Sequence, residues 1–240
     1  LGFFKNSPGL DAGEDKIIRW TGTWGDISTQ SFYPPHHLTM GEGGAVNIIN
    51  SRKLAVISES FRDWGRDCWC HTGCDNTCKK RFGWKFEGLP LGYDHKYTYS
   101  NLGYNLKMSD MQAAVGLAQI KKASFFHRKR KANFNYLYKF FSNYKKYFIL
   151  PESSVNAEPS WFGFPLTIKK GVKINREKLI KYLNNFNVGT RLLFAGNLTR
   201  QPYMKFQKYR VINSLKQSDE IMRRTFWIGL YPGLDKTNLQ

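Results

Sequence analysis

The sequence predicts an α/β protein, in which short strands alternate with amphipathic helices. Between residues 162 and 168 apolar side chains alternate with other residues, as in a strand with one buried face. At 111–118 the apolar residues follow helical spacing. Hydrophobic residues make up 41% of the 240 residues, which is enough for a core. No apolar run approaches the roughly 20 residues that span a bilayer.

The chain is strongly basic, with a formal net charge of +19. Lysine and arginine are dense at 79–81 and 128–131. Such a charge favours anionic partners, namely nucleic acid, an acidic membrane or a phosphorylated small molecule. The N-terminus has no signal-peptide pattern, so we expect a cytoplasmic protein without membrane contact. The first residue is Leu1 and not Met, which suggests a fragment.

The first half of the chain contains one stretch that resembles a site. It covers residues 29–45 and reads Thr-Gln-Ser-Phe-Tyr-Pro-Pro-His-His-Leu-Thr-Met-Gly-Glu-Gly-Gly-Ala. Short strands are expected on either side of it, at 27–32 and 45–49. Ser51 is expected to cap a helix over about 52–62.

The clearest helix start lies further along. Ser109 and Gln112 have the S-x-x-Q form of a capping box, with an apolar stripe behind them. The helical pattern continues, with a break near 123–124, to about Tyr147. Within residues 1–20 no secondary-structure element is clear before Ile17 and Ile18.

The second half predicts a small α/β unit. A polar linker at 151–159 is the best domain boundary in the sequence. Asn175 precedes a helix expected at about 176–186. Further strands are expected at 188–194 and 226–231.

Two adjacent imidazoles give the stretch at 29–45 its chemical interest. Prolines stiffen its backbone, and glycines allow geometry that a Cβ would forbid. His36 and His37 carry the side chain whose proton affinity lies nearest neutral pH. Glu42 is a candidate for a proton relay. Alternatively the stretch is a surface loop with two solvated histidines and a solvated carboxylate.

All four cysteines lie between Cys68 and Cys78, in the pattern C-x-C-x3-C-x3-C. An extracellular disulfide framework would spread its cysteines over distant segments. Four thiols this close together indicate ligation of a metal or cluster in a reducing compartment. Thiolates bind zinc and iron–sulfur clusters alike, and the spacing matches neither common pattern. The alternative is four reduced cysteines in a loop.

The stretch from Ser31 to Gly44 resembles the active-site motif of the DegT/DnrJ/EryC1 sugar aminotransferases. Their motif reads S-F-x-P-x-K, then H or N, then I-T-x-x-E-G-G, and its lysine forms a Schiff base with pyridoxal phosphate. Here that position holds His36. This exchange, together with the cysteines, is similar to the iron–sulfur members among the nucleotide-sugar 3-dehydratases. Residues 103–114 and 191–197 also resemble that group.

The resemblance implies the pyridoxal-phosphate-dependent transferase fold of type I, the aspartate aminotransferase-like α/β fold. It covers the sequence from Thr21 to the end. An incomplete large domain would occupy residues 21–150, with a Cys-rich insert at 66–82, and a small α/β domain 151–240. Residues 1–20 diverge from the family. We therefore expect the C-terminal half of a longer enzyme.

The resemblance also implies roles for single residues. His36 would be the catalytic base, working with pyridoxamine or pyridoxal 5'-phosphate. Ser31 would bind the cofactor phosphate, and Asn105 would do so across the interface of a homodimer. Arg191 and Asn197 are weaker candidates for substrate binding. Alternatively Asn105 is a turn residue and Arg191 a solvated charge on a strand.

A [2Fe-2S] cluster is implied as a second cofactor, on Cys68, Cys70 and Cys78. The family's fourth cysteine would lie near Leu10, where this sequence has none, so Cys74 is the candidate within the chain. The implied substrate is a nucleotide sugar like CDP-4-keto-6-deoxyglucose, dehydrated at C3 in lipopolysaccharide and O-antigen dideoxysugar biosynthesis. A flavin/iron–sulfur reductase would be the partner.

Two other hypotheses stay open from the sequence. One is a basic, zinc-stabilised module that binds nucleic acid through its lysines and arginines. The other is an inactive fragment of the dehydratase.

Overall fold

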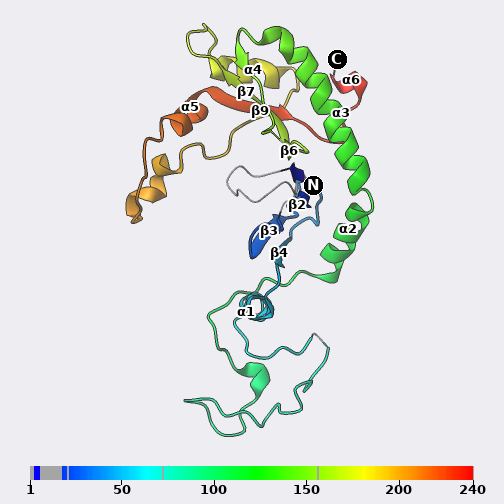
Figure 1. Cartoon of the computed structure of the whole chain (residues 1–240), viewed down its shortest axis with the longest axis vertical. Coiled ribbons are helices and arrows are strands. Elements are labelled where there is room, and N and C mark those ends of the chain that lie inside the picture. The colour runs from blue at the N-terminus through cyan, green and yellow to red at the C-terminus, as the bar shows by residue number, and fades with distance from the viewer. Residues whose placement is uncertain (1–2, 6–17, 21, 72, 156, 240) are drawn as a thin grey trace, which may run out of the picture. The chain divides into compact units, whose positions relative to one another are not determined.

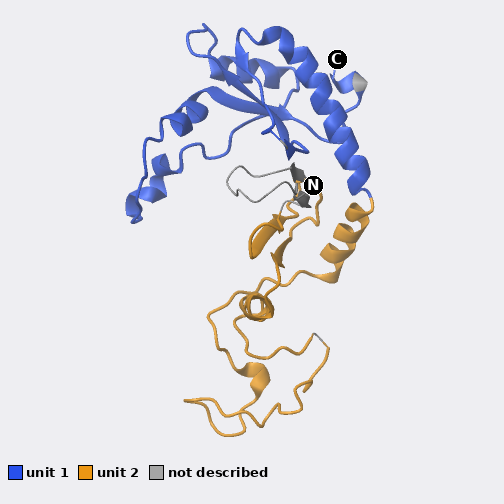
Figure 2. Ribbon diagram, in the orientation of Figure 1, with its two compact units in different colours: residues 1–19, 122–240 blue, residues 20–121 orange. Residues whose placement is uncertain are grey.

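A computed structural model of the chain describes all residues except 1–2, 6–17, 21, 72, 156 and 240 (Figure 1). Leu10, near which a fourth cysteine was expected, therefore lies outside the described residues. The chain divides into two compact units (Figure 2). The N-terminal unit is Trp20–Lys121, and the C-terminal unit combines residues 1–19 with Lys122–Gln240. The division falls near Lys122, well before the linker predicted at 151–159.

In the N-terminal unit, the strands β3 (Ile27–Ser31) and β4 (Gly44–Ile48) form an antiparallel pair. Ser31 lies opposite Gly44 in this register, so the pair holds the two ends of the candidate site loop together. Helix α1 (Arg52–Arg62) follows, and Ser51 Oγ accepts a hydrogen bond from Leu54 N at 3.3 Å. These elements confirm the sequence predictions.

Backbone contacts hold the end of α1 to the chain that follows the cysteines. Asp63 pairs with Asn105 and Arg66 with Tyr99 in isolated antiparallel bridges. A 3-10 turn, η1 (His95–Tyr97), lies between the partners of these bridges. Helix α2 (Asp110–Ile120) then begins with the predicted capping box, in which the side chains of Ser109 and Gln112 cap each other's backbone.

The C-terminal unit begins with the long helix α3 (Ala123–Phe141), so the predicted break at 123–124 is confirmed. The 3-10 turn η2 (Ser142–Tyr144) ends this helix before Tyr147. An antiparallel sheet of four strands follows, in the order β5-β7-β9-β8. Its strands are β5 (Phe148–Ile149), β7 (Gly163–Ile168), β8 (Thr190–Leu192) and β9 (Thr225–Gly229).

Helices and 3-10 turns connect the strands of this sheet along the chain. Asn175 precedes α4 (Arg176–Asn185), as predicted, and caps it by accepting a hydrogen bond from Lys178 N at Oδ1, at 2.9 Å. The sequence did not predict the helix α5 (Lys216–Arg224), nor the sheet with the order β2-β1-β6, formed by β2 (Ile18–Trp20), β1 (Phe3–Lys5) and β6 (Ala157–Glu158). The remaining elements are η3 (Leu198–Arg200), η4 (Pro202–Phe206) and α6 (Lys236–Leu239).

The main apolar core lies in the C-terminal unit. The alternation predicted at 162–168 is confirmed at its even positions, because Phe164, Leu166 and Ile168 are only 0–4% exposed. They pack with Leu137 of α3 and with strand residues of β9. The buried cluster consists of Leu137, Phe148, Leu150, Phe164, Leu166, Ile168, Phe226, Ile228 and Leu230. Each such side chain contributes about 1.5–3 kcal/mol by leaving water.

No helix in the described part of the chain is long and apolar enough to cross a membrane.

Candidate active site and cysteine cavity

The loop between β3 and β4 is closed by hydrogen bonds beyond the strand pair. Phe32 N donates to Gly43 O at 2.9 Å, and Met40 N donates to Phe32 O at 2.9 Å. Within the loop, His36 N donates to Tyr33 O at 3.0 Å, which forms a tight turn through the two prolines. The chain around His36 is thus a defined turn.

The ring of His36 is held by the loop itself. Its Nδ1 lies 3.2 Å from the carbonyl oxygen of Ser31, which can only accept, so Nδ1 carries the hydrogen. In the neutral ring the lone pair is then on Nε2, the form that can take a proton. The ring of Tyr33 meets it edge-on, with centroids 6.0 Å apart. His37 is half-buried beside it.

Ser31 is exposed, and its Oγ accepts a hydrogen bond from Tyr33 N at 3.2 Å. Its hydroxyl hydrogen therefore remains as a donor for another group, since a hydroxyl both donates and accepts. The structure brings Ser31 and His36 together in one loop, and their roles toward a cofactor stay predictions.

Met40 fixes this loop to α2. It is 6% exposed, and it lies so close to Gly116 that a Cβ there would come within 2.8 Å of its Cγ. Gln112 Nε2 also donates to the backbone oxygen of Glu42 at 3.0 Å. The carboxylate of Glu42 is exposed, and a proton-relay role for it stays a prediction.

The other predicted site residues are distant in sequence from Ser31 and His36, and each makes contacts with its own neighbours. Asn105 pairs with Asp63 in a backbone bridge, and its side chain is exposed. In the C-terminal unit, Arg191 is exposed on β8 and donates to Thr190 O at 2.8 Å. Asn197 is 4% exposed and donates to Asp219 Oδ1 at 2.8 Å. Roles in cofactor or substrate binding stay predictions for all of them.

Three of the four cysteines share one small cavity. Cys68, Cys70 and Cys78 line it, whereas Cys74 is exposed and lies outside it. The other lining residues are Asp75, Asn76, Arg81, His95 and Lys96. Among the residues that the structure describes, no three His, Cys, Asp or Glu side chains converge closely enough to hold one metal ion. A cluster on these cysteines therefore stays a prediction.

The cavity cysteines differ in acidity. Burial, and then the neighbouring Cys70 and Cys78 thiols, raise the pKa of Cys68. The hydroxyl of Thr77 lies 3.0 Å from Cys70 Sγ and lowers the pKa of that thiol. The backbone N–H of Lys80 donates to Cys78 Sγ at 3.4 Å and lowers its pKa as well. The latter two environments favour the thiolate, which is the form that binds metals.

Arg81 fastens the loop that carries these cysteines. Its guanidinium makes a two-pronged ion pair with Asp94, with distances of 2.9 and 2.7 Å. It also reaches Asp75 at 3.4 Å, and Lys96 pairs with the same Asp75. This network ties the cysteine loop to the start of η1.

His95 is a site residue that the sequence analysis missed. It is 1% exposed and packs against the rings of Trp69, Trp84 and Phe86, with centroids 5.3, 4.9 and 5.6 Å away. Its Nε2 lies 2.8 Å from Asp67 Oδ2. A histidine that follows a run of cysteines is a usable signal, because metal sites often combine the two.

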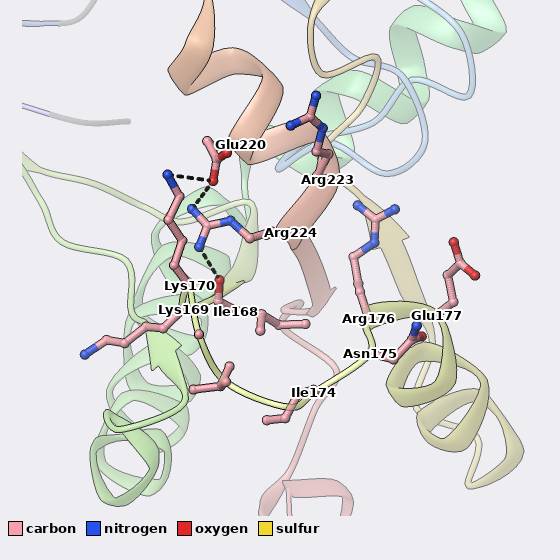
Figure 3. A pocket seen from close by; sticks show the side chains of 12 residues that line it. Ile168, Lys169, Lys170, Ile174, Asn175, Arg176, Glu177, Glu220, Arg223 and Arg224 are labelled. Atoms are coloured by element: carbon pink, nitrogen blue, oxygen red, sulfur yellow. Dashed lines mark hydrogen bonds and ion pairs between the residues drawn. The ribbon is translucent and has the colours of Figure 1, made fainter.

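A larger cavity, of about 460 Å³, lies in the C-terminal unit between the end of β7, the start of α4 and α5 (Figure 3). Arg224 and Lys170 both pair with Glu220 there, at 2.6 and 3.4 Å. Arg224 also donates to Ile168 O at 2.9 Å. The remaining residues that line this cavity are Lys169, Gly171, Val172, Ile174, Asn175, Arg176, Glu177 and Arg223. None of the predicted site residues lines it.

A model of the DegT/DnrJ/EryC1/StrS aminotransferase family matches residues 11–240. The chain belongs to this family. It is 58% identical over 218 residues to the lipopolysaccharide biosynthesis protein RfbH of Salmonella typhimurium, a match that covers 91% of this chain and 50% of RfbH. It is 50% identical over 216 residues to dTDP-4-dehydro-2,6-dideoxy-D-glucose 3-dehydratase of Saccharopolyspora spinosa, with 90% and 46% covered.

Solved structures agree on the fold. The structure of the E. coli GDP-4-keto-6-deoxy-D-mannose-3-dehydratase with bound hydrated PLP superposes with a TM-score of 0.73 at 24% identity. That match covers 95% of this chain and 55% of the other. The fold predicted from the sequence, pyridoxal-phosphate-dependent type I, is therefore confirmed.

This family member spans about half the length of the curated relatives it matches, 50% of one and 46% of another. Those relatives are named as a lipopolysaccharide biosynthesis protein and as sugar 3-dehydratases. The family match favours an enzyme of this type over a nucleic-acid-binding module.

Proposed function

We propose that this chain carries the catalytic loop of a pyridoxamine-phosphate-dependent 3-dehydratase, which removes the C3 hydroxyl of a nucleotide-linked 4-keto-6-deoxyhexose. The observation that supports this is His36, whose imidazole stands where the aminotransferases have their Schiff-base lysine. The hydrogen bond to the Ser31 carbonyl leaves the lone pair of the neutral ring on Nε2. Without an amine at this position, the loop is suited to proton transfer and not to holding the cofactor covalently.

The cofactor, when bound, supplies the amine that joins the substrate ketone and a conjugated ring that takes up an electron pair. His36 takes a proton at Nε2 and is the base of the reaction. Ser31 donates its hydroxyl hydrogen to the cofactor phosphate, since its Oγ already accepts from Tyr33 N. Asn105 is proposed for the same phosphate from the partner copy of a homodimer. The residues of the loop thus fit the group that the family implies.

The substrate and the partners are further parts of the proposal. We propose a substrate like that of CDP-4-keto-6-deoxy-D-glucose-3-dehydrase, contacted by Arg191 and Asn197, for dideoxysugars of lipopolysaccharide. Two relatives are named for dTDP-linked and GDP-linked sugars, so these nucleotide sugars are the competitors to test against the CDP-linked sugar in a binding assay. Cys68, Cys70 and Cys78 are proposed to hold an iron–sulfur cluster that a reductase partner serves.

The test replaces His36 with the lysine of the aminotransferases. In His36→Lys, added pyridoxal phosphate should attach covalently at position 36, because an amine now meets the aldehyde. Borohydride makes the link permanent, and peptide mass mapping then locates it. The full chain is used, and the reading does not depend on turnover.

His37→Lys is the matched control, because it has the same number of lysines and changes the adjacent position. Attachment at position 36 well above that at position 37 is the expected result. Equal labelling of both variants, or no label at position 36, would show that the cofactor does not lie over this loop.

A further inference from the structure

The cavity in the C-terminal unit is basic. Five basic and two acidic side chains line it, which gives the lining a formal net charge of +3. A concave surface with such a surplus of positive charge concentrates anions. All of its lining residues belong to one compact unit. The basic ones are Lys169, Lys170, Arg176, Arg223 and Arg224.

Glu220 is the acidic residue that pairs within this cavity. Its Oε2 lies 2.6 Å from Arg224 Nη2 and 3.4 Å from Lys170 Nζ (Figure 3). Two cations therefore share one carboxylate oxygen, and one positive charge of this group is not offset. Arg224 also donates to Ile168 O at 2.9 Å, which fixes its guanidinium on the wall of the cavity.

Arg176 and Arg223 have no carboxylate partner among the described residues. Arg176 Nη1 donates to the backbone oxygen of Met222 at 2.5 Å, which orients the side chain and leaves Nη2 as a further donor. Arg223 is exposed and makes neither a hydrogen bond nor an ion pair in the described part of the chain. The two guanidinium groups extend to the same side in Figure 3. Arginine suits phosphate, because its planar fork of N–H donors matches the phosphate oxygens.

The apolar part of the cavity wall belongs to the packed core. Ile168 is 4% exposed in the buried cluster, and Val172 and Ile174 pack against that cluster. Gly171 has a φ of +81° and turns the loop here, and nothing lies within 4 Å of its Cβ position. The volume of about 460 Å³ is that of a small-molecule site, and such sites are usually preformed.

We propose that this cavity binds a small molecule with two linked phosphate groups, held by Arg176 and Arg223. A phosphate monoester carries about −1.5 to −2 charges at neutral pH, so one group would leave part of the positive surplus and two would offset it. A carboxylate would offset less. The proposal does not rest on the proposed function, because no residue of this cavity belongs to the candidate catalytic loop or to the cysteine cavity.

The probe is inorganic pyrophosphate, titrated into the full chain at low salt and followed by calorimetry. Arg223→Gln should weaken binding about tenfold, the scale of one charge-assisted hydrogen bond. This variant keeps the contacts that shape the cavity, since Arg223 makes none of them. Lys216→Gln is the matched control, because it removes the same charge from an exposed residue of α5 outside the cavity. It should change the affinity by less than about twofold, since salt screens a charge that does not touch the ligand.

Three results of the titration would overturn the proposal. The first is no binding of pyrophosphate to the unmodified chain. The second is equal weakening in Arg223→Gln and Lys216→Gln, which would show a response to the overall charge of the chain. The third is equal affinity for inorganic phosphate and pyrophosphate, because two linked phosphates should bind more tightly than one.

Hydrogen exchange then locates the bound pyrophosphate. It should slow exchange at the amides of residues 169–176 and leave those of 31–44 unchanged. Protection at 31–44 alone would place pyrophosphate at the loop proposed for the cofactor phosphate, and would overturn the assignment to this cavity. Failure of the dehydratase proposal is a separate result, because covalent labelling of His36→Lys reports on that loop alone.

Discussion

Different interactions stabilise each of the two units of this chain. In the C-terminal unit nine apolar side chains form one buried cluster around α3 and the four-stranded sheet. In the N-terminal unit Met40 is the one hydrophobic residue counted as buried among the described residues, beside the polar His95 and Thr98. Backbone bonds supply its order, such as Trp64 N to Tyr104 O at 2.8 Å.

This difference concerns function, because the candidate catalytic loop and the cysteine cavity both belong to the unit with little core. Helix α2 illustrates it, with apolar side chains that are 45–80% exposed. These are Met111, Val115, Leu117 and Ile120. Large exposed apolar surfaces usually mark contacts with another polypeptide. The homodimer proposed above would offer α2 such a contact.

The largest effect is expected in the C-terminal core. Phe164→Ala removes a fully buried ring and should lower the free energy of unfolding by about 3–5 kcal/mol, because the cavity cannot fully collapse. Phe206→Ala is the control, since this ring is 85% exposed and should change the free energy by less than about 0.5 kcal/mol. Urea unfolding of both variants measures the difference. Similar losses in both would show that the buried cluster is not the main source of stability.

The sequence predicted elements with local signals and missed those without them. Caps at Ser51, Ser109 and Asn175 gave three helices, and alternation gave β7. Helix α5 was missed because its nine residues are mostly charged or polar and no side chain caps its start. The strands β1, β2 and β5 have only two or three residues, too few for a pattern.

The candidate site shows the same limit. His36 could be recognised because its motif is contiguous. For His95 the sequence offers only its place after the run of cysteines, because Asp67 and Cys78 lie far from it in the sequence and only the fold brings them together. The spacing of the cysteines suggested Cys74 as a ligand but could not show that its side chain is exposed outside the cavity.

A second effect should appear in the N-terminal unit, at Gly65. Its φ is +85°, and a Cβ would lie 1.8 Å from the backbone oxygen of Asn101. Gly65→Ala should therefore cost on the order of 3 kcal/mol, since backbone must move as well as adopt a strained φ. Faster hydrogen exchange at the amides of Trp64, Asn101 and Tyr104 would report the loss.

Gly73→Ala separates the two causes. Gly73 also has a positive φ, +79°, but nothing lies within 4 Å of its Cβ position. The cost should then be only the strain of φ, about 1–2 kcal/mol. Equal costs at Gly65 and Gly73 would mean that the close backbone approach does not hold this unit together.

A third effect links the core of the N-terminal unit to its site. Met40→Ala removes the side chain that packs the candidate catalytic loop against α2, and should lower the free energy of unfolding by about 2 kcal/mol. The Phe32 amide, bonded to Gly43 O at 2.9 Å, should exchange faster. Met108→Ala, at a residue 49% exposed, is the control. Unchanged exchange at Phe32 would show that the loop is ordered without Met40.

The smallest effect is electrostatic and belongs to the C-terminal unit. Arg200, and then Asn197, hold the pKa of Asp219 well below its usual range through hydrogen bonds to the carboxylate. A depressed pKa adds stability that is present above the unfolded pKa, roughly 3.9, and is lost as the pH falls through the folded one. Asp219→Asn should therefore lower the thermal midpoint at pH 7, with a difference that shrinks in acid.

The control for this prediction is Glu152→Gln, which removes the same charge from an exposed residue with no ion pair in the described structure. Its thermal midpoint should follow the unmodified chain at every pH. Asp219→Asn could instead lower the thermal midpoint equally at pH 7 and pH 3. Asp219 would then stabilise the unit through its hydrogen bond to the Asn197 turn and not through its charge. That result would place Asn197 and Asp219 in the packed framework of the C-terminal unit. A pH-dependent difference would show that the ion pair with Arg200, at 2.5 Å, stabilises the segment that carries Asn197.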